Sequence, residues 1–96
     1  MTSFLVQTTC KTVRIQTKSW GYENSYDLGN CGSQQIYHKN FMSYEEECCQ
    51  PAGLYTLTCK CSYGDGWHGG YLEINGTKYC EEFKHGYSKL VTVNFN

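Results

Sequence analysis

The 96-residue sequence lacks the features that define several large protein classes. It has no run of roughly 18 apolar residues, so we expect no segment that inserts in a membrane. Neither sign of charge dominates, because eight Lys and Arg face nine Asp and Glu for a formal net charge of −1. That balance argues against a nucleic-acid binder and against an acidic tail. Helical patterns are nearly absent, and we find no internal repeat, low-complexity tract or linker.

Catalytic signatures are missing as well. Neither a Ser–His–Asp pattern nor a pair of carboxylates spaced for acid–base work stands out. A Cys–His nucleophile would join an unpaired thiol to His38, His68 or His85, and nothing in the sequence brings such a pair together. We therefore expect a protein that is not an enzyme.

Aromatic side chains and cysteines are what the sequence has instead. Nine Tyr, four Phe and two Trp indicate a folded chain, and residues 1–96 form one domain of ordinary small size. Such a chain buries only about 60–65 % of its unfolded surface, so its core is marginal. Seven cysteines therefore predict stabilising disulfides and an oxidising, extracellular compartment.

We expect three bridges among these cysteines and one thiol left over, either buried and free or joining two chains. The seven are Cys10, Cys31, Cys48, Cys49, Cys59, Cys61 and Cys80. Adjacent Cys48 and Cys49 cannot easily bridge each other. Plausible pairs are Cys59 with Cys80 across neighbouring strands, and Cys31 or Cys10 with the 48/49 pair.

The first residues of the sequence do not have the pattern that secretion would lead one to expect. Met1 is followed directly by residues 2–6, without the charged and apolar regions of a signal peptide. Either the sequence is a mature chain with an added Met, or the prediction of secretion is wrong.

Short segments with alternating apolar residues predict a chain made mostly of strands. They cover 11–17, 34–39, 54–61, 71–74, 77–80 and 89–95, with weaker patterns near 4–9 and 24–28. Asn75-Gly76 predicts a tight hairpin, since both central residues of a type I′ turn need positive φ. One helical turn is expected at 43–48, where Ser43 and Glu46 form a capping box. Seven or eight short strands predict an antiparallel sandwich or a small barrel.

The most unusual segment is the glycine-rich loop at 62–70, Ser-Tyr-Gly-Asp-Gly-Trp-His-Gly-Gly. Glycines let backbone carbonyls crowd around one point, and Asp65 adds a carboxylate, which together suit Ca²⁺. The alternative interpretation is a glycine-rich loop with Trp67 tucked into the core as a lid.

A second loop, at 19–27, combines aromatics with Glu23, Asn24 and Asp27. If the two loops share one end of a sandwich, Glu23 and Asp65 meet, and a bound cation relieves the repulsion between them. Glu23 and Asp65 are thus the expected metal ligands. The alternative is that Glu23 and Asp27 are solvated and that Trp20 lies in the core.

The same two loops, 19–27 and 63–70, predict a sugar site. Proteins hold saccharides with an aromatic plate for the C–H face and a few polar groups that fix orientation. The candidate ligand-binding residues are Asp65, Trp67, His68, Asn24, Tyr22 and Tyr63. Exposed Tyr and Trp also suit protein interfaces, so the pattern is not exclusive to sugars.

Two further patterns concern zinc and glycosylation. Zinc held by Cys59, Cys61, the 48/49 pair and His68 lacks the usual Cys-x₂-Cys spacing, and disulfides explain these cysteines better. Asn75-Gly76-Thr77 is a sequon for N-glycosylation of Asn75 at the expected hairpin tip. The alternative is that Asn-Gly is present because the tight turn needs it.

The loop motifs carry a family resemblance. Residues 57–59 followed by 62–67, with Trp-Gly-Tyr-Glu-Asn-Ser-Tyr at 20–26, resemble a small secreted cysteine-rich domain of invertebrate, especially cnidarian, extracellular proteins. The pattern is also similar to CUB-like domains. The similarity covers most of 10–83, but only the two loop motifs are specific. An Asp is common in this pattern where Cys61 stands, so one potential ion ligand is replaced.

The resemblance implies a jelly-roll or CUB-like β-sandwich whose acidic loop residues hold Ca²⁺, and an extracellular binding or adhesion role that includes lectins. We accordingly expect a secreted carbohydrate-binding protein, assisted by Ca²⁺, that binds glycans on cell surfaces or glycoproteins. A single sugar site is weak, so a homo-oligomer is expected to supply avidity. The alternative is an extracellular protein–protein module: a toxin, defence or matrix component.

Overall fold

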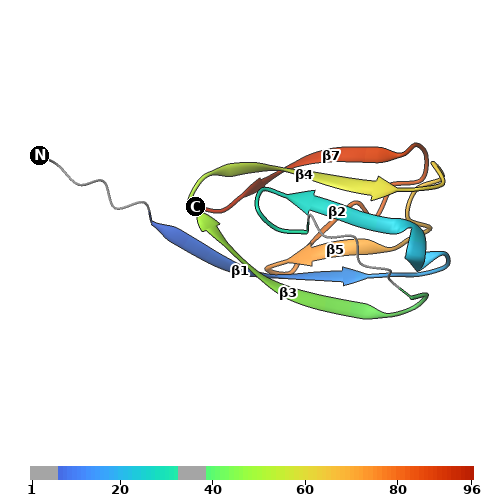
Figure 1. Ribbon diagram of the computed structural model, residues 1–96, viewed down its shortest axis with the longest axis horizontal. Helices are drawn as coiled ribbons and strands as arrows, with labels where there is room; N and C mark the ends of the chain where they lie inside the picture. The colour runs from blue at the N-terminus through green and yellow to red at the C-terminus, as the bar shows by residue number, and fades with distance from the viewer. Residues whose placement is uncertain (1–6, 33–38) are drawn as a thin grey trace, which may run out of the picture.

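The computed structural model describes residues 7–32 and 39–96, which form two antiparallel β-sheets packed face to face (Figure 1). In chain order the elements are β1 (Thr8–Gln16), the 3₁₀ turn η1 (Gly21–Glu23), β2 (Asn24–Leu28), β3 (Ser43–Pro51), β4 (Leu54–Cys61), β5 (Tyr71–Ile74), β6 (Thr77–Tyr79) and β7 (Ser88–Asn94). One sheet has the strand order β3-β1-β5-β6 and the other β2-β4-β7. The predicted antiparallel, all-β architecture is confirmed.

The alternating segments form strands because one face of each is apolar. In β4 the side chains of Leu57, Cys59 and Cys61 are buried, while Thr58 and Lys60 lie between them on the other face. β2, β4 and β5 have the predicted bounds. The strand predicted at 34–39 falls outside the described residues, apart from Lys39, and so do the first residues of the pattern near 4–9.

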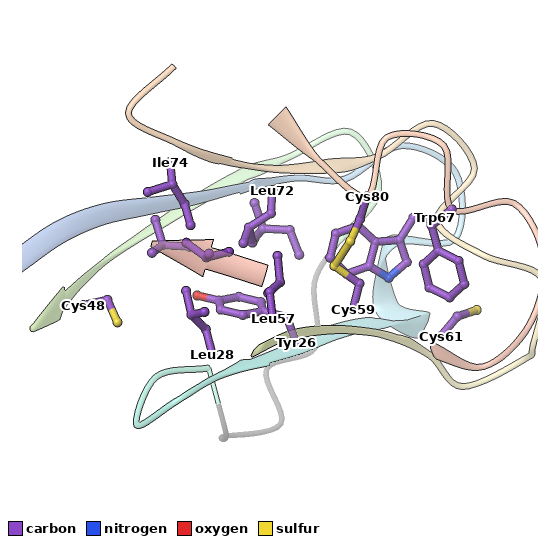
Figure 2. Packing of buried hydrophobic residues seen from close by; sticks show 14 of the residues in the cluster. Tyr26, Leu28, Cys48, Leu57, Cys59, Cys61, Trp67, Leu72, Ile74 and Cys80 are labelled. Carbon is purple, nitrogen blue, oxygen red and sulfur yellow. A yellow bond between two sulfur atoms is a disulfide. The ribbon is translucent and has the colours of Figure 1, made fainter. Parts of the chain in front are cut away.

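The core fills the space between the two sheets. Leu28 and Leu57 of the β2-β4-β7 sheet point toward Leu72 and Ile74 of the opposite sheet (Figure 2). Burying one such side chain contributes roughly 1.5–3 kcal/mol. Aromatic side chains complete this small core, with Phe95 packed edge-on against Tyr55 at 5.3 Å between ring centroids.

Three disulfides hold the sandwich together: Cys10–Cys49, Cys31–Cys48 and Cys59–Cys80. Cys10 and Cys49 face each other in the β1–β3 ladder. Cys59–Cys80 joins β4 to the segment after β6, so it links the two sheets and does not connect neighbouring strands as predicted. Cys61 forms no disulfide: it is the seventh, free thiol, and it is buried.

The helical turn predicted at 43–48 is wrong, because these residues belong to β3. All nine residues of β3 pair with β1, from Ser43 opposite Gln16 to Pro51 opposite Thr8. A capping box satisfies two backbone donors, whereas the ladder pairs the backbone along the whole strand. Tyr44, Glu46, Cys48 and Gln50 turn inward and the residues between them outward, so the segment carries a period-two pattern after all.

Candidate functional site

The two loops predicted to form the site leave the same end of neighbouring strands. Asn24 begins β2 and pairs with Cys61, the last residue of β4. Contact continues beyond the strands, because the N–H of Ser62 donates to the carbonyl oxygen of Glu23 over 3.0 Å. The loops therefore meet at the end of the sandwich that lies away from the C-terminus (Figure 1), which is the convergence expected from the sequence.

A third segment, residues 84–87, packs against the glycine-rich loop. The N–H of Gly86 donates to the carbonyl oxygen of Gly64 over 2.9 Å, and the N–H of Cys61 donates to that of Tyr87 over 2.8 Å. A Cβ at Gly64 would lie 2.7 Å from the Tyr87 ring, so glycine is required for this close approach. The sequence did not predict a role for this segment. A glycine followed by an aromatic residue, Gly86-Tyr87, is its only recognisable pattern.

Glu23, Cys61 and Asp65 form the chemical centre of the site, with one ligand-type atom of each within 4.8 Å of the others. The Cys61 sulfur lies 3.2 Å from Oδ1 of Asp65 and 3.8 Å from Oε1 of Glu23. Nε2 of His68 lies 3.3 Å from Oδ2 of Asp65. Only 5 % of Glu23 and 2 % of Cys61 are exposed, so two of the three central residues lie inside the protein.

Burial sets the protonation of the cluster. It raises the pKa of Glu23, which the Asp65 carboxylate raises further and His68 lowers. Burial also raises the pKa of Cys61, so its thiol keeps its proton at neutral pH. The hydrogen bond from that thiol is the main cause that lowers the pKa of Asp65. A neutral S–H donor thus stands between two carboxylates.

The residues of the 19–27 loop are not arranged as the alternative interpretation had them. Glu23 is buried, not solvated, and Asp27 forms an ion pair with Lys60 across the β2–β4 ladder. Trp20 is 48 % exposed and does not belong to the core.

The side chains of this cluster differ from the all-oxygen ligand sets that calcium prefers. Ca²⁺ takes six to eight oxygen ligands. Here the oxygens of Glu23 and Asp65 are interleaved with the sulfur of Cys61 and the imidazole of His68, which are softer ligands. The two expected metal ligands do come together, in a donor set that also contains a sulfur and an imidazole.

Two predicted ligand-binding residues are buried and offer no surface. Trp67 is 0 % exposed; its Nε1–H donates to the carbonyl oxygen of Lys60 over 2.7 Å, and its ring packs against Phe83. Trp67 is therefore the lid of the core, as the alternative interpretation proposed, and not a plate for a sugar. Asn24 is 1 % exposed, because it is an inward position of β2.

Other aromatic side chains are exposed at this end of the molecule. They form what we call the aromatic rim: Trp20, Tyr22, Tyr63 and Tyr87, which are 48–71 % exposed. Trp20 and Tyr22 meet edge to face, with ring centroids 6.1 Å apart. The pKa of Tyr22 is raised by partial burial and then by the charges of Glu23, Tyr63 and Asp65. Trp20 and Tyr87 were not among the predicted ligand-binding residues.

The remaining candidates lie away from this end. Asn75 is exposed at the tip of the β5–β6 hairpin with a φ of 51°, as the Asn-Gly turn requires. Cys10, Glu47 and Cys49 also lie close together, but both of these sulfurs are committed to a disulfide.

No protein-family model, curated protein or solved structure matches the chain. The described residues contain no helix with the length and apolar character needed to cross a membrane. The site must therefore be interpreted from its own chemistry.

Proposed function

We propose that this chain is a secreted, non-enzymatic carbohydrate-binding protein whose ligand lies on the aromatic rim. Three disulfides in so small a chain favour an extracellular compartment. The observation that carries the proposal is that four exposed aromatic side chains gather beside the exposed carboxylate of Asp65 and the imidazole of His68.

This combination suits the two sides of a sugar ring. The apolar C–H face packs on an aromatic plate such as Tyr63, which is 71 % exposed. The hydroxyls need donors and acceptors, which Asp65, His68 and the phenol of Tyr22 supply.

The rim is a surface, so the affinity of one site for one sugar is expected to be weak. Several sites on one assembly raise the effective affinity without new contacts. We therefore propose a homo-oligomer that binds glycans on cell surfaces or glycoproteins.

A glycan array tests the proposal, with the chain applied both singly and coupled to a multivalent carrier under non-reducing conditions. Tyr63→Ala is expected to abolish binding to the glycans that the wild type retains. Leu90→Ala is the matched control. Leu90 is 68 % exposed on β7, so its substitution removes a similar apolar surface away from the aromatic rim.

The same rim would also suit a protein partner, since Tyr and Trp are enriched among the residues that dominate protein–protein binding. An empty array in both formats, or equal binding by wild type and Tyr63→Ala, would overturn the glycan proposal. The protein–protein module is then the remaining candidate. Haemagglutination that a simple sugar blocks separates the two cheaply.

A further inference from the structure

We propose that Glu23, Cys61, Asp65 and His68 bind a thiophilic divalent cation, with zinc as the best match. Two of these ligands come from strand ends or turns, since Glu23 closes η1 and Cys61 closes β4. Asp65 and His68 come from the loop that follows β4. The proposal does not depend on glycan binding.

The donor set is the first argument. Zinc in proteins takes four ligands from thiolate sulfur, imidazole nitrogen and carboxylate oxygen. The cluster supplies one sulfur, one imidazole and two carboxylates. Calcium and magnesium prefer oxygen alone, so a thiol at the centre of the cluster selects against them.

The distances are the second argument. Zinc bonds of about 2.3 Å to sulfur and about 2.0–2.1 Å to nitrogen and oxygen, set at tetrahedral angles, put sulfur about 3.5 Å from oxygen and nitrogen about 3.3 Å from oxygen. The Cys61 sulfur lies 3.2 Å from Asp65 Oδ1 and 3.8 Å from Glu23 Oε1. His68 Nε2 lies 3.3 Å from Asp65 Oδ2. Cys61 thus has the spacing of a zinc ligand to both carboxylates, within a group of three whose ligand atoms lie within 4.8 Å of one another. His68 has that spacing to Asp65 only, so its side chain must rotate to complete the set of four.

The buried carboxylate of Glu23 is an independent argument for a cation. Glu23 is 95 % buried and faces a second carboxylate, that of Asp65. Among the ion pairs of the described residues, no Lys or Arg joins either group, and the imidazole of His68, in contact with Asp65, is the one basic side chain paired with them. A buried charge is costly unless a countercharge compensates it. A divalent cation supplies that charge and relieves the repulsion.

The fold leaves Cys61 available as a ligand. The other six cysteines are consumed by three disulfides, whereas Cys61 stays reduced and buried. Its burial excludes a second protein chain from the sulfur but leaves it in contact with the two carboxylates. Binding converts the thiol to a thiolate, and one proton leaves to solvent.

Metal titration of the full chain tests the proposal, after dialysis against a chelator and with the disulfides intact. Co²⁺ is the spectroscopic probe, because a Co²⁺–thiolate bond gives a charge-transfer absorption band. We expect one Co²⁺ per chain with that band, displacement by Zn²⁺ but not by Ca²⁺, and a Tm that rises with Zn²⁺.

The variants are Cys61→Ser and His68→Gln, with Glu45→Gln and His85→Gln as controls. Glu45 and His85 are exposed and lie outside the cluster. Each site variant is expected to weaken Zn²⁺ binding by more than the 10–100-fold typical of losing an outer-shell partner. His68→Gln changes a partly exposed side chain, so it tests the site even if Cys61→Ser folds poorly.

Three outcomes would overturn the proposal: no Co²⁺ or Zn²⁺ binding, Zn²⁺ binding that the two site variants leave unchanged, or selective binding of Ca²⁺. All of these assays omit sugar. Failure of the metal site is thus distinguishable from failure of glycan binding, which is measured on the Tyr63→Ala variant.

Discussion

The sulfur of Cys61 lies 3.2 Å from Oδ1 of Asp65, four residues further along the chain. The glycine-rich loop after β4 turns back on the strand that precedes it, and this places an acidic side chain against a free thiol. Glu23 approaches the same sulfur from β2's side of the sheet, at 3.8 Å. Two carboxylates therefore share one donor, and the cluster must respond to pH.

Glu23→Gln tests that response in the metal-free protein. The pKa of Glu23 is raised above its ordinary value of 4.5, chiefly by burial, so the folded chain holds this proton more tightly than the unfolded chain. Protonated Glu23 therefore makes its full contribution to the free energy of unfolding below about pH 4.5. That contribution is lost as pH rises through the raised pKa. We expect the free energy of unfolding of Glu23→Gln, measured in urea, not to fall over this pH range.

Asp65 acts in the opposite direction, because its pKa is lowered and its contribution grows as pH rises from below 3.8. That window lies below the one assigned to Glu23, so measurements above pH 4.5 separate the two. Glu45→Gln, on the exposed face of β3, is the control and should follow the wild type. A wild type that gains stability steadily from pH 4.5 to 8, in step with Glu23→Gln, would contradict the assignment.

The disulfides are expected to supply much of the stability. Removing Cys59–Cys80 in the double variant Cys59→Ala, Cys80→Ala frees a loop whose ends are 21 residues apart. Chain entropy alone makes that loss about 3 kcal/mol. Both sulfurs are buried in the core, so a packing loss adds to it. Urea unfolding under non-reducing conditions measures the change.

Cys10–Cys49 provides the comparison, because both of these cysteines are exposed and removal of their bridge leaves the core intact. The double variant Cys10→Ala, Cys49→Ala is therefore expected to lose the entropic term without the packing term. The Cys10–Cys49 loop is the longer one, 39 residues against 21, so its entropic loss is larger by about 0.5 kcal/mol. A loss for the buried pair that falls below the Cys10–Cys49 loss by that difference would show that packing around Cys59–Cys80 contributes little.

The strands and the disulfides were largely predictable because both depend on local pattern. β4 shows why: apolar or cysteine side chains at every second position leave one arrangement that buries them all. Ser43–Pro51 was missed because Ser43 and Glu46 match a helix start. The strand is decided by the β1 ladder, in which Arg14 lies opposite Glu45, and that partner is 31 residues away along the chain.

The site was predictable in place but not in detail. The pairing of Asn24 with Cys61 brings the two loops together, and turn-rich loops at a shared strand end predict that much. Which tryptophan is buried depends on tertiary contacts. The backbone N–H of Trp67 donates to the carbonyl oxygen of Phe83 over 2.8 Å. Trp20 is also followed by a glycine, but within the described residues its backbone N–H donates no such hydrogen bond.

The two tryptophans should therefore behave oppositely. Trp67→Ala removes a fully buried indole and its hydrogen bond to Lys60, with an expected cost of about 3–5 kcal/mol. Trp20→Ala removes a side chain that is 48 % exposed, so stability should change by about 0.5 kcal/mol or less. Urea unfolding checks both values.

Glycan binding supplies the second measurement. Trp20→Ala is expected to weaken binding on the array while the protein stays folded, because Trp20 lies in the aromatic rim. A Trp20→Ala variant that unfolds as readily as Trp67→Ala would mean that Trp20 has a structural role, and equal glycan binding would remove it from the ligand surface.

Asn75 is expected to carry an N-linked glycan when the chain is secreted from eukaryotic cells. Asn75-Gly76-Thr77 is exposed at the tip of the β5–β6 hairpin, within reach of a transferase and away from the aromatic rim. Thr77→Ala removes the sequon but keeps the Asn-Gly turn, so it tests modification without disturbing the hairpin. We expect peptide N-glycosidase to shift the mobility of the secreted wild type and not of Thr77→Ala. Wild type secreted without a shift would show that the Asn-Gly pair serves the turn alone.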